Sequence, residues 1–221
     1  ISAQQVWTFR QAAHAARTRT LSALANAKRL RVVPTTVRMR HRLTRSMALA
    51  KASYTWAHNT PWQRDIRALR SSTVNTLWGK RRNRRRNPVL LATWGPTAHE
   101  AGWADPQVVQ VVVAVSRAAA VMRNQDSVEQ AVRWFADRYE ALQSQPRTTL
   151  LAGVVSACVN ACRDVGLELD FPSEHQIVLR DPYVAGAGIS LIEDVPMASL
   201  VRRVRWYAIG ALLRGVERQG W

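Results

Sequence analysis

The residues with the clearest chemical potential in this 221-residue chain are arginines. A short basic run consists of Lys80, Arg81, Arg82, Arg84, Arg85 and Arg86. A second basic row has helical spacing, at Arg38, Arg42 and Arg45. Such a row repels itself by a few tenths of a kcal/mol per pair in water, and an anion lying across it would remove that cost. Both patterns favour contacts with phosphate groups, although a solvated helix face gives the second pattern equally well.

The charge of the chain is concentrated in its first part. Residues 1–87 contain 20 of the 32 Lys and Arg but only one acid, Asp65, for a net charge of +19. Residues 88–221 contain 12 basic and 14 acidic residues, for a net charge of −2. A codon bias toward arginine would explain why only three of the basic residues are Lys, but it does not explain why acids are missing from one half. The asymmetry favours a nucleic acid as the partner.

The sequence offers no comparable pattern for catalysis. A two-metal polymerase or nuclease site needs clustered carboxylates, and the basic part has only Asp65. Cys158 and Cys162 lack the second ligand pair that a structural zinc site requires, so we expect them to be buried as small apolar residues. The histidines are isolated, and the sequence contains neither a phosphate-binding glycine loop nor a nucleophile elbow. We therefore expect no catalytic residue, no metal ligand and no cofactor in this segment.

No run of about 18 apolar residues occurs in the sequence, which argues against a membrane span and a membrane partner. No feature indicates secretion or an oxidising compartment. We expect an intracellular protein, nuclear or cytoplasmic. The chain starts at Ile1 and stops at Trp221, and we expect it to be a fragment of a longer reading frame.

The elements that must position the basic residues are predicted to be helices. Apolar periodicity predicts a long helix over residues 4–30, and Pro34 ends it. In the next helix we expect a buried stripe opposite the basic row, formed by Leu43, Met47, Ala50 and Tyr54. A third helix is expected to start at Pro61, with Thr60 and Gln63 as a capping box, and to end at Gly79. Its buried stripe is Ile66, Leu69, Thr73 and Leu77.

The second half is also predicted to be mainly helical. Asp105 and Pro106 start a buried helix, and Ser127 caps another helix that reaches residue 143. Residues 167–180 are typical of short extended segments, and Pro196 starts a last helix with Arg202, Arg203 and Arg205 on its exposed side. The predicted fold class is mostly α, with one or two helical bundles and a short β-like segment. We predict a basic helical domain over residues 1–99 and a C-terminal helical domain of unknown role over residues 100–221.

Several tryptophans lie beside the basic stretch, namely Trp56, Trp62, Trp78 and Trp94. Tryptophan is usually buried in a core, whereas an exposed one can stack on a nucleic-acid base. The sequence leaves open which members of this set are exposed.

The order of these pieces resembles a known family. The stretch 27–34, the second helix with Ser46 and Met47, and the stretch 65–70 leading to Leu77-Trp78-Gly79 are similar to the region downstream of the palm in LINE-type (non-long-terminal-repeat) retrotransposon reverse transcriptases. The resemblance covers about residues 6–99. It implies a thumb-like helical segment that grips an RNA–DNA hybrid or duplex through its backbone. The nucleic-acid-binding residues would be Arg38, Arg42, Arg45, Lys80, Arg81, Arg82, Arg84, Arg85 and Arg86.

The same resemblance implies that the catalytic carboxylates, with their divalent metal, belong to an upstream polymerase domain of the same chain that is missing here. This segment would then be part of an RNA-directed DNA polymerase without catalysing polymerisation itself. Two alternatives remain open at the level of sequence. One is a free-standing basic helical module that binds nucleic acid, and the other is an inactive retroelement relic.

Overall fold

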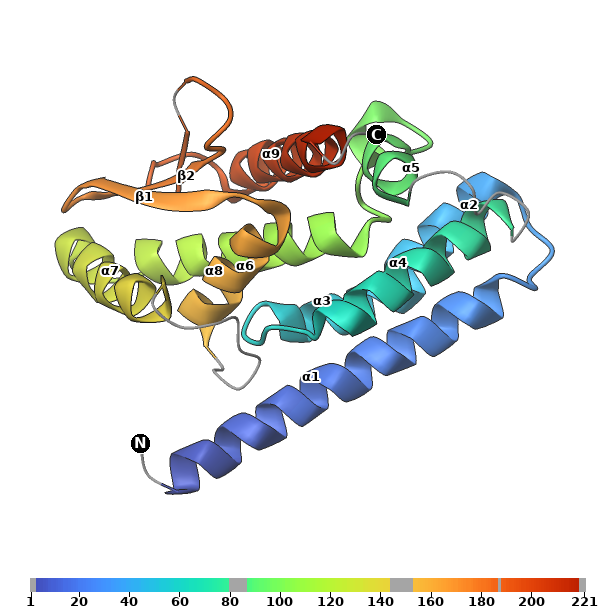
Figure 1. The fold of residues 1–221 in the computed structure, drawn as a ribbon, viewed down its shortest axis with the longest axis horizontal. Coiled ribbons are helices and arrows are strands. Elements are labelled where there is room, and N and C mark those ends of the chain that lie inside the picture. Colours follow the sequence, from blue (N-terminus) through green and yellow to red (C-terminus); the bar gives the residue numbers. More distant parts are fainter. Residues whose placement is uncertain (1–2, 80–86, 144–152, 187, 219–221) are drawn as a thin grey trace.

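The computed structural model describes residues 3–79, 87–143, 153–186 and 188–218 (Figure 1). The helices of the first part are α1 (Ala3–Leu30), α2 (Val37–Leu43), the π-helical segment η1 (Thr44–Leu49), α3 (Ala50–Trp56) and α4 (Gln63–Trp78). They are followed by α5 (Asn87–Thr93), the 3₁₀ turn η3 (Ala98–Glu100), α6 (Pro106–Arg123), α7 (Val128–Gln143), α8 (Val154–Val165) and α9 (Met197–Arg218). The strands β1 (Glu168–Ser173), β2 (Gln176–Arg180) and β3 (Ile189–Ser190) form an antiparallel sheet in the order β1-β2-β3. The predicted fold class, mostly α with a short β segment, is confirmed.

The first part of the chain forms a bundle in which α1 lies along both α4 and the η1–α3 helix (Figure 1). Small side chains line the contact, and Ala23, Ala27, Ala48 and Ala52 are fully buried there. Because these side chains are short, the helix backbones approach closely enough for Asn26 to donate a hydrogen bond to the carbonyl of Met47. Alanine therefore serves here both as a helix former and as a spacer.

The stripe predicted for the second helix is wrong. Met47 is 51% exposed and Tyr54 is 74% exposed, while His41 and Thr44 are fully buried together with the small Ala48 and Ala52. The helix is continuous from α2 to α3 but contains the π-helical segment η1, in which the backbone bonds to the fifth residue back. The interior side of this helix thus contains small and polar residues beside the large Leu49 and Trp56, whereas Met47 and Tyr54 point outward.

The start of α4 also differs from the predicted capping box. The helix begins at Gln63 rather than Pro61, and Trp62 is its N-cap without a side-chain bond. The hydroxyl of Thr60 instead accepts a hydrogen bond from Asn160, and the amide of Gln63 donates to Asp164 at 2.9 Å. Both side chains are used for contacts with α8. The buried stripe of α4 and its end at Gly79 are confirmed, and Gly79 has φ +78° and ψ 164°, outside the left-handed helical region.

Helix α6 is the central helix of the molecule, and it contacts α3, α4, α7, α8 and α9 (Figure 1). Its valines and alanines are buried around most of its circumference, which explains why its sequence lacks a polar face. Asp105 caps it by accepting a hydrogen bond from the backbone of Gln107 at 2.9 Å, as predicted. Ser127 likewise accepts from the backbone of Gln130 at the start of α7. The expected burial of Cys158 and Cys162 on α8 is confirmed.

The sheet and α9 cover the other side of α6. Leu169 pairs with Leu179 across β1 and β2, and both side chains are buried. One prediction for α9 is wrong, because Arg205 is only 4% exposed. Its guanidinium lies 5.4 Å from the rings of both Trp103 and Trp206, and it donates a hydrogen bond to the carbonyl of His99. The aromatic rings and this carbonyl allow the cation to be buried.

Residues 1–99 and 100–221 meet across several polar contacts. One of them is the buried ion pair between Arg70 on α4 and Asp105 at the start of α6, with 2.6 Å between Nη2 and Oδ2. Arg70 also donates to the side chain of Gln107. The division into two domains stays a prediction. Within the described ranges, no helix has the length and apolar character needed to cross a membrane.

Candidate nucleic-acid interface

The predicted site residues fall into two groups. Lys80, Arg81, Arg82, Arg84, Arg85 and Arg86 lie outside the described residues. Arg38, Arg42 and Arg45 are exposed on the α2–η1 helix. Arg42 lies 3.7 Å from the carboxylate of Glu100, and the guanidinium of Arg45 lies 4.7 Å from the ring of Trp103. Two members of the row therefore face the loop between α5 and α6, where one is paired with an acid and the other is stacked on a ring.

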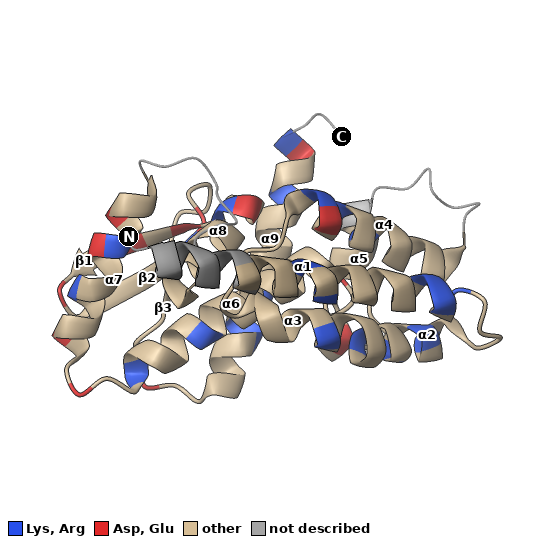
Figure 2. Cartoon of the chain, turned by 90° about the horizontal axis from the view of Figure 1, so that it is seen from below, with Lys and Arg blue, Asp and Glu red and all other residues tan. Residues whose placement is uncertain are grey.

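The described residues reveal a larger group of exposed cations on α1 to α4 and the turns between them. We call this group the cationic shell, and it consists of Arg19, Lys28, Arg29, Arg31, Arg38, Arg42, Arg45, Lys51, Arg64 and Arg67. Figure 2 shows blue Lys and Arg positions distributed along α1, α2 and α3. The acid-free composition of residues 1–64 is the signal in the sequence for this group, whereas helical spacing points to only three of its members, Arg38, Arg42 and Arg45.

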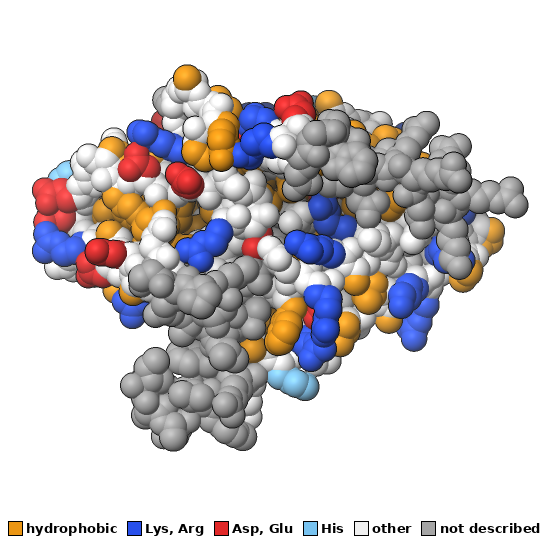
Figure 3. Space-filling view, in the orientation of Figure 1, with side chains coloured by type: hydrophobic (Ala, Val, Ile, Leu, Met, Phe, Trp, Pro, Cys, Tyr) orange, Lys and Arg blue, Asp and Glu red, His pale blue; other side chains and the backbone are white. Residues whose placement is uncertain are grey.

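The single acid of residues 1–87 is removed from the surface. Asp65 is 6% exposed, and its carboxylate lies 3.6 Å from Arg17 and 3.8 Å from Arg64. The described surface of α1 to α4 therefore presents cations without an exposed carboxylate. On the face shown in Figure 3, most acidic side chains lie toward the end formed by α7 and the sheet, while Lys and Arg dominate over α1 and α4. Such a surface can bind a string of phosphates without reading a sequence.

The four tryptophans beside the basic run have different environments. Trp56 is fully buried, and its indole N–H donates to the hydroxyl of Thr20 at 3.2 Å. Trp78 and Trp94 are half-buried and meet edge to face, with 5.1 Å between their ring centroids. Trp62 is 44% exposed and has the guanidinium of Arg17 at 5.4 Å from its ring. Of these four, Trp62 is the ring most accessible to a base.

A buried histidine lies beside the basic row. His41 is fully buried, neither ring nitrogen has a hydrogen-bond partner among the described residues, and its ring meets Trp94 edge to face at 5.2 Å. Burial lowers the pKa of His41, Glu100 opposes this effect, and the charges of Arg45 and Arg42 add to the lowering. The imidazole is therefore neutral at pH 7 and adds no charge to the cationic shell.

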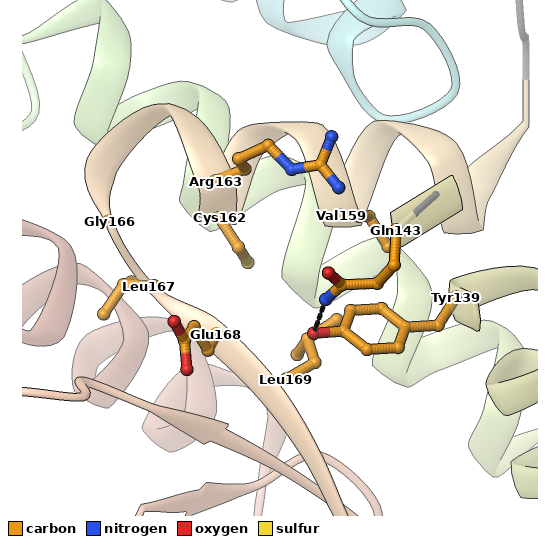
Figure 4. A pocket seen from close by; sticks show the side chains of 9 residues that line it. All are labelled: Tyr139, Gln143, Val159, Cys162, Arg163, Gly166, Leu167, Glu168 and Leu169. Atoms are coloured by element: carbon orange, nitrogen blue, oxygen red, sulfur yellow. Dashed lines mark hydrogen bonds between the residues drawn. The ribbon is translucent and has the colours of Figure 1, made fainter. Parts of the chain in front are cut away.

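One candidate nucleophile beside a pocket is Cys162. A pocket of about 230 Å³ lies between α7, α8 and β1, with Tyr139 and Gln143 from α7 and Glu168 and Leu169 from β1 (Figure 4). A hydrogen bond with Cys158 and burial raise the pKa of the Cys162 thiol well above its usual value. A nucleophilic cysteine needs the opposite shift, because the thiolate is the reactive form. The arrangement favours a packing role for Cys162.

The described residues contain no group of three or more His, Cys, Asp and Glu side chains arranged to hold a metal ion. The candidate interface therefore consists of the cationic shell and the exposed ring of Trp62. On the neighbouring surface, arginines stack on the rings of Tyr54 and Trp103. Sequence reasoning missed Trp103 because no periodic pattern surrounds it, and it missed Tyr54 because that residue was placed in the core. Comparison with protein-family models, with curated proteins and with solved structures finds no match for this chain.

Proposed function

We propose that this chain binds nucleic acid through the phosphate backbone, as the thumb-like segment of a LINE-type reverse transcriptase would hold the template and primer. The observation that carries the proposal is the contrast between the exposed cations of α1 to α4 and the buried Asp65. In this proposal the chain supplies grip on a duplex, and the polymerase carboxylates with their divalent metals belong to a palm domain outside it.

A backbone contact of this kind has a quantitative signature. Each neutralised phosphate lowers the logarithm of the binding constant by about 0.9 per tenfold increase in salt for duplex DNA. Contacts with phosphate carry no base information, so affinity for an RNA–DNA hybrid and for double-stranded DNA should be comparable and should depend little on sequence.

The experiment is a salt titration of the 221-residue chain with short labelled duplexes, read by fluorescence anisotropy. Two triple variants remove three charges each from the proposed interface: Arg29, Arg31 and Arg38 changed to Gln, and Arg84, Arg85 and Arg86 changed to Gln. We expect both to weaken binding to every duplex alike and to lower the salt slope by up to about 2.7.

A matched control removes the same charge from the other half of the molecule, with Arg133, Arg138 and Arg180 changed to Gln. These three residues are exposed on α7 and β2. If net charge alone governed binding, the control would behave like the two test variants, and the proposed interface would be wrong. Absence of duplex binding by the wild-type chain at low salt would remove the nucleic-acid proposal altogether.

A further inference from the structure

A groove beside the cationic shell runs between α3, α6 and α9. It has a volume of about 650 Å³, and its apolar lining includes Ala57, Val112, Val113 and Val201. Helices α3 and α6 lie next to each other, as Figure 2 shows, and form two of its sides. The lining includes Ala50, Ser53 and Tyr54 on α3 and continues to Ala57 and His58 in the turn that follows the helix.

Two aromatic rings line this groove, and arginines already stack on both. The ring of Tyr54 is 74% exposed, and the guanidinium of Arg19 lies 5.2 Å from its centroid. The ring of Trp103 has Arg45 at 4.7 Å and Arg205 at 5.4 Å. Planar groups thus stack on these rings within the protein itself, and the largely exposed Tyr54 has ring surface left for another planar group.

The polar groups of the groove are cationic or uncharged. Arg117 lines it and is exposed, and burial together with the charge of Arg117 lowers the pKa of the neighbouring His58. The hydroxyl of Ser116 is buried and has no hydrogen-bond partner among the described residues. No Asp or Glu is among the described residues that line the groove. An occupant should therefore combine negative charge with apolar or aromatic surface.

Few ligands meet both requirements. A small anion would leave the apolar lining uncovered, and a purely apolar helix would leave Arg117 without a counter-charge. A single strand of nucleic acid has a flat base and a phosphate in every nucleotide, and proteins bind such strands by combining aromatic stacking with cationic contacts.

We propose that the groove between α3, α6 and α9 binds a single strand of nucleic acid, with a base stacked on Tyr54 and a phosphate at Arg117. This site differs from the duplex contact of the cationic shell in both ligand form and key residues, so each can fail without the other.

The test uses the full chain and labelled eight-nucleotide single strands, with a blunt duplex as the second probe. Tyr54→Ala should weaken single-strand binding roughly 5- to 100-fold, the range for losing one stacked base, and leave duplex affinity within about twofold. Arg117→Gln should lower the single-strand salt slope by about 0.7, the value for one phosphate contact. An abasic strand should bind the wild type about as weakly as the normal strand binds Tyr54→Ala.

Matched controls remove the same chemistry elsewhere. Tyr183 is another exposed tyrosine with a stacked arginine, Arg218 at 3.6 Å, and Arg138 lies 4.7 Å from the ring of Trp134. Tyr183→Ala and Arg138→Gln should leave single-strand affinity unchanged.

Three results would overturn the proposal. The first is an equal effect of the test and control variants, or no effect of either. The second is undiminished binding of the abasic strand, which would mean that no base stacks in the groove. The third is a wild-type dimer in sedimentation that Tyr54→Ala dissociates, because the groove would then hold a second copy of the chain. Duplex binding that persists in Tyr54→Ala keeps the cationic shell proposal intact in each case.

Discussion

Changing Asp105 should destabilise the whole molecule, because this buried carboxylate makes two separate interactions. It pairs with Arg70 at 2.6 Å, and it caps α6 through the backbone of Gln107. Both charged side chains are buried, so Asp105→Ala leaves a guanidinium without its partner, which costs about 3–5 kcal/mol, and removes a cap worth about 1 kcal/mol. The expected loss in the free energy of unfolding is about 4–6 kcal/mol. For a chain of this length that corresponds to a drop in melting temperature of about 2–4 °C per kcal/mol.

The assay is urea unfolding followed by tryptophan fluorescence, with a double-mutant cycle. Arg70→Met in the Asp105→Ala background removes the orphaned charge, so the double variant should recover about 2–4 kcal/mol. Glu129→Ala is the surface control, since the exposed Glu129–Arg133 pair on α7 has a similar 2.8 Å contact but should contribute only about 0.3–0.5 kcal/mol. Additive effects of the two single substitutions would refute the view that this pair is a coupled buried contact between residues 1–99 and 100–221.

Two further predictions concern His41 on α2 and Gly102 in the loop before α6. Burial is the chief cause of the lowered pKa of His41 in the folded protein. As the pH falls below about 6.5, this histidine therefore binds a proton in the unfolded chain before it does so in the folded protein. The free energy of unfolding should consequently decrease as the pH falls below about 6.5. His41→Phe, which keeps the edge contact with Trp94, should flatten this pH dependence in urea unfolding between pH 7.5 and 5, and parallel curves would contradict it. Gly102→Ala should cost about 2–4 kcal/mol, because φ is +76° and a Cβ would lie 2.8 Å from Ile209 Cδ1. Gly79→Ala, at φ +78° with open space around it, should show the backbone cost alone, and an equal loss in both variants would exclude the Ile209 clash.

The sequence predicted elements that local chemistry specifies. Asp105 followed by Pro106 identified the start of α6, since an acceptor side chain and a residue without an N–H both suit a first helical turn. Ser127 likewise identified the start of α7, where its hydroxyl accepts a hydrogen bond from the backbone of Gln130. These signals act within a few residues and do not require knowledge of what packs nearby.

The errors arose where tertiary contacts decide the outcome. Thr60 and Gln63 have the spacing of a capping box, yet both are engaged by α8, about 100 residues further along the chain. Arg205 was assigned to the surface because an isolated guanidinium is costly to bury, but two rings and a carbonyl from other elements surround it. Neither set of partners can be read from a window of neighbouring residues.

The misplaced Tyr54 shows how one packing choice links the fold to the candidate groove. Hydrophobic periodicity favours the large Tyr54 side chain for the core, but the core between α1 and the η1–α3 helix is filled by Leu49, Trp56 and several alanines. The ring is consequently on the outside, where Arg19 of α1 stacks on it and α6 lies across the groove. The packing of the basic bundle therefore leaves an aromatic surface beside exposed cations, and this combination is the one that a nucleic-acid strand requires.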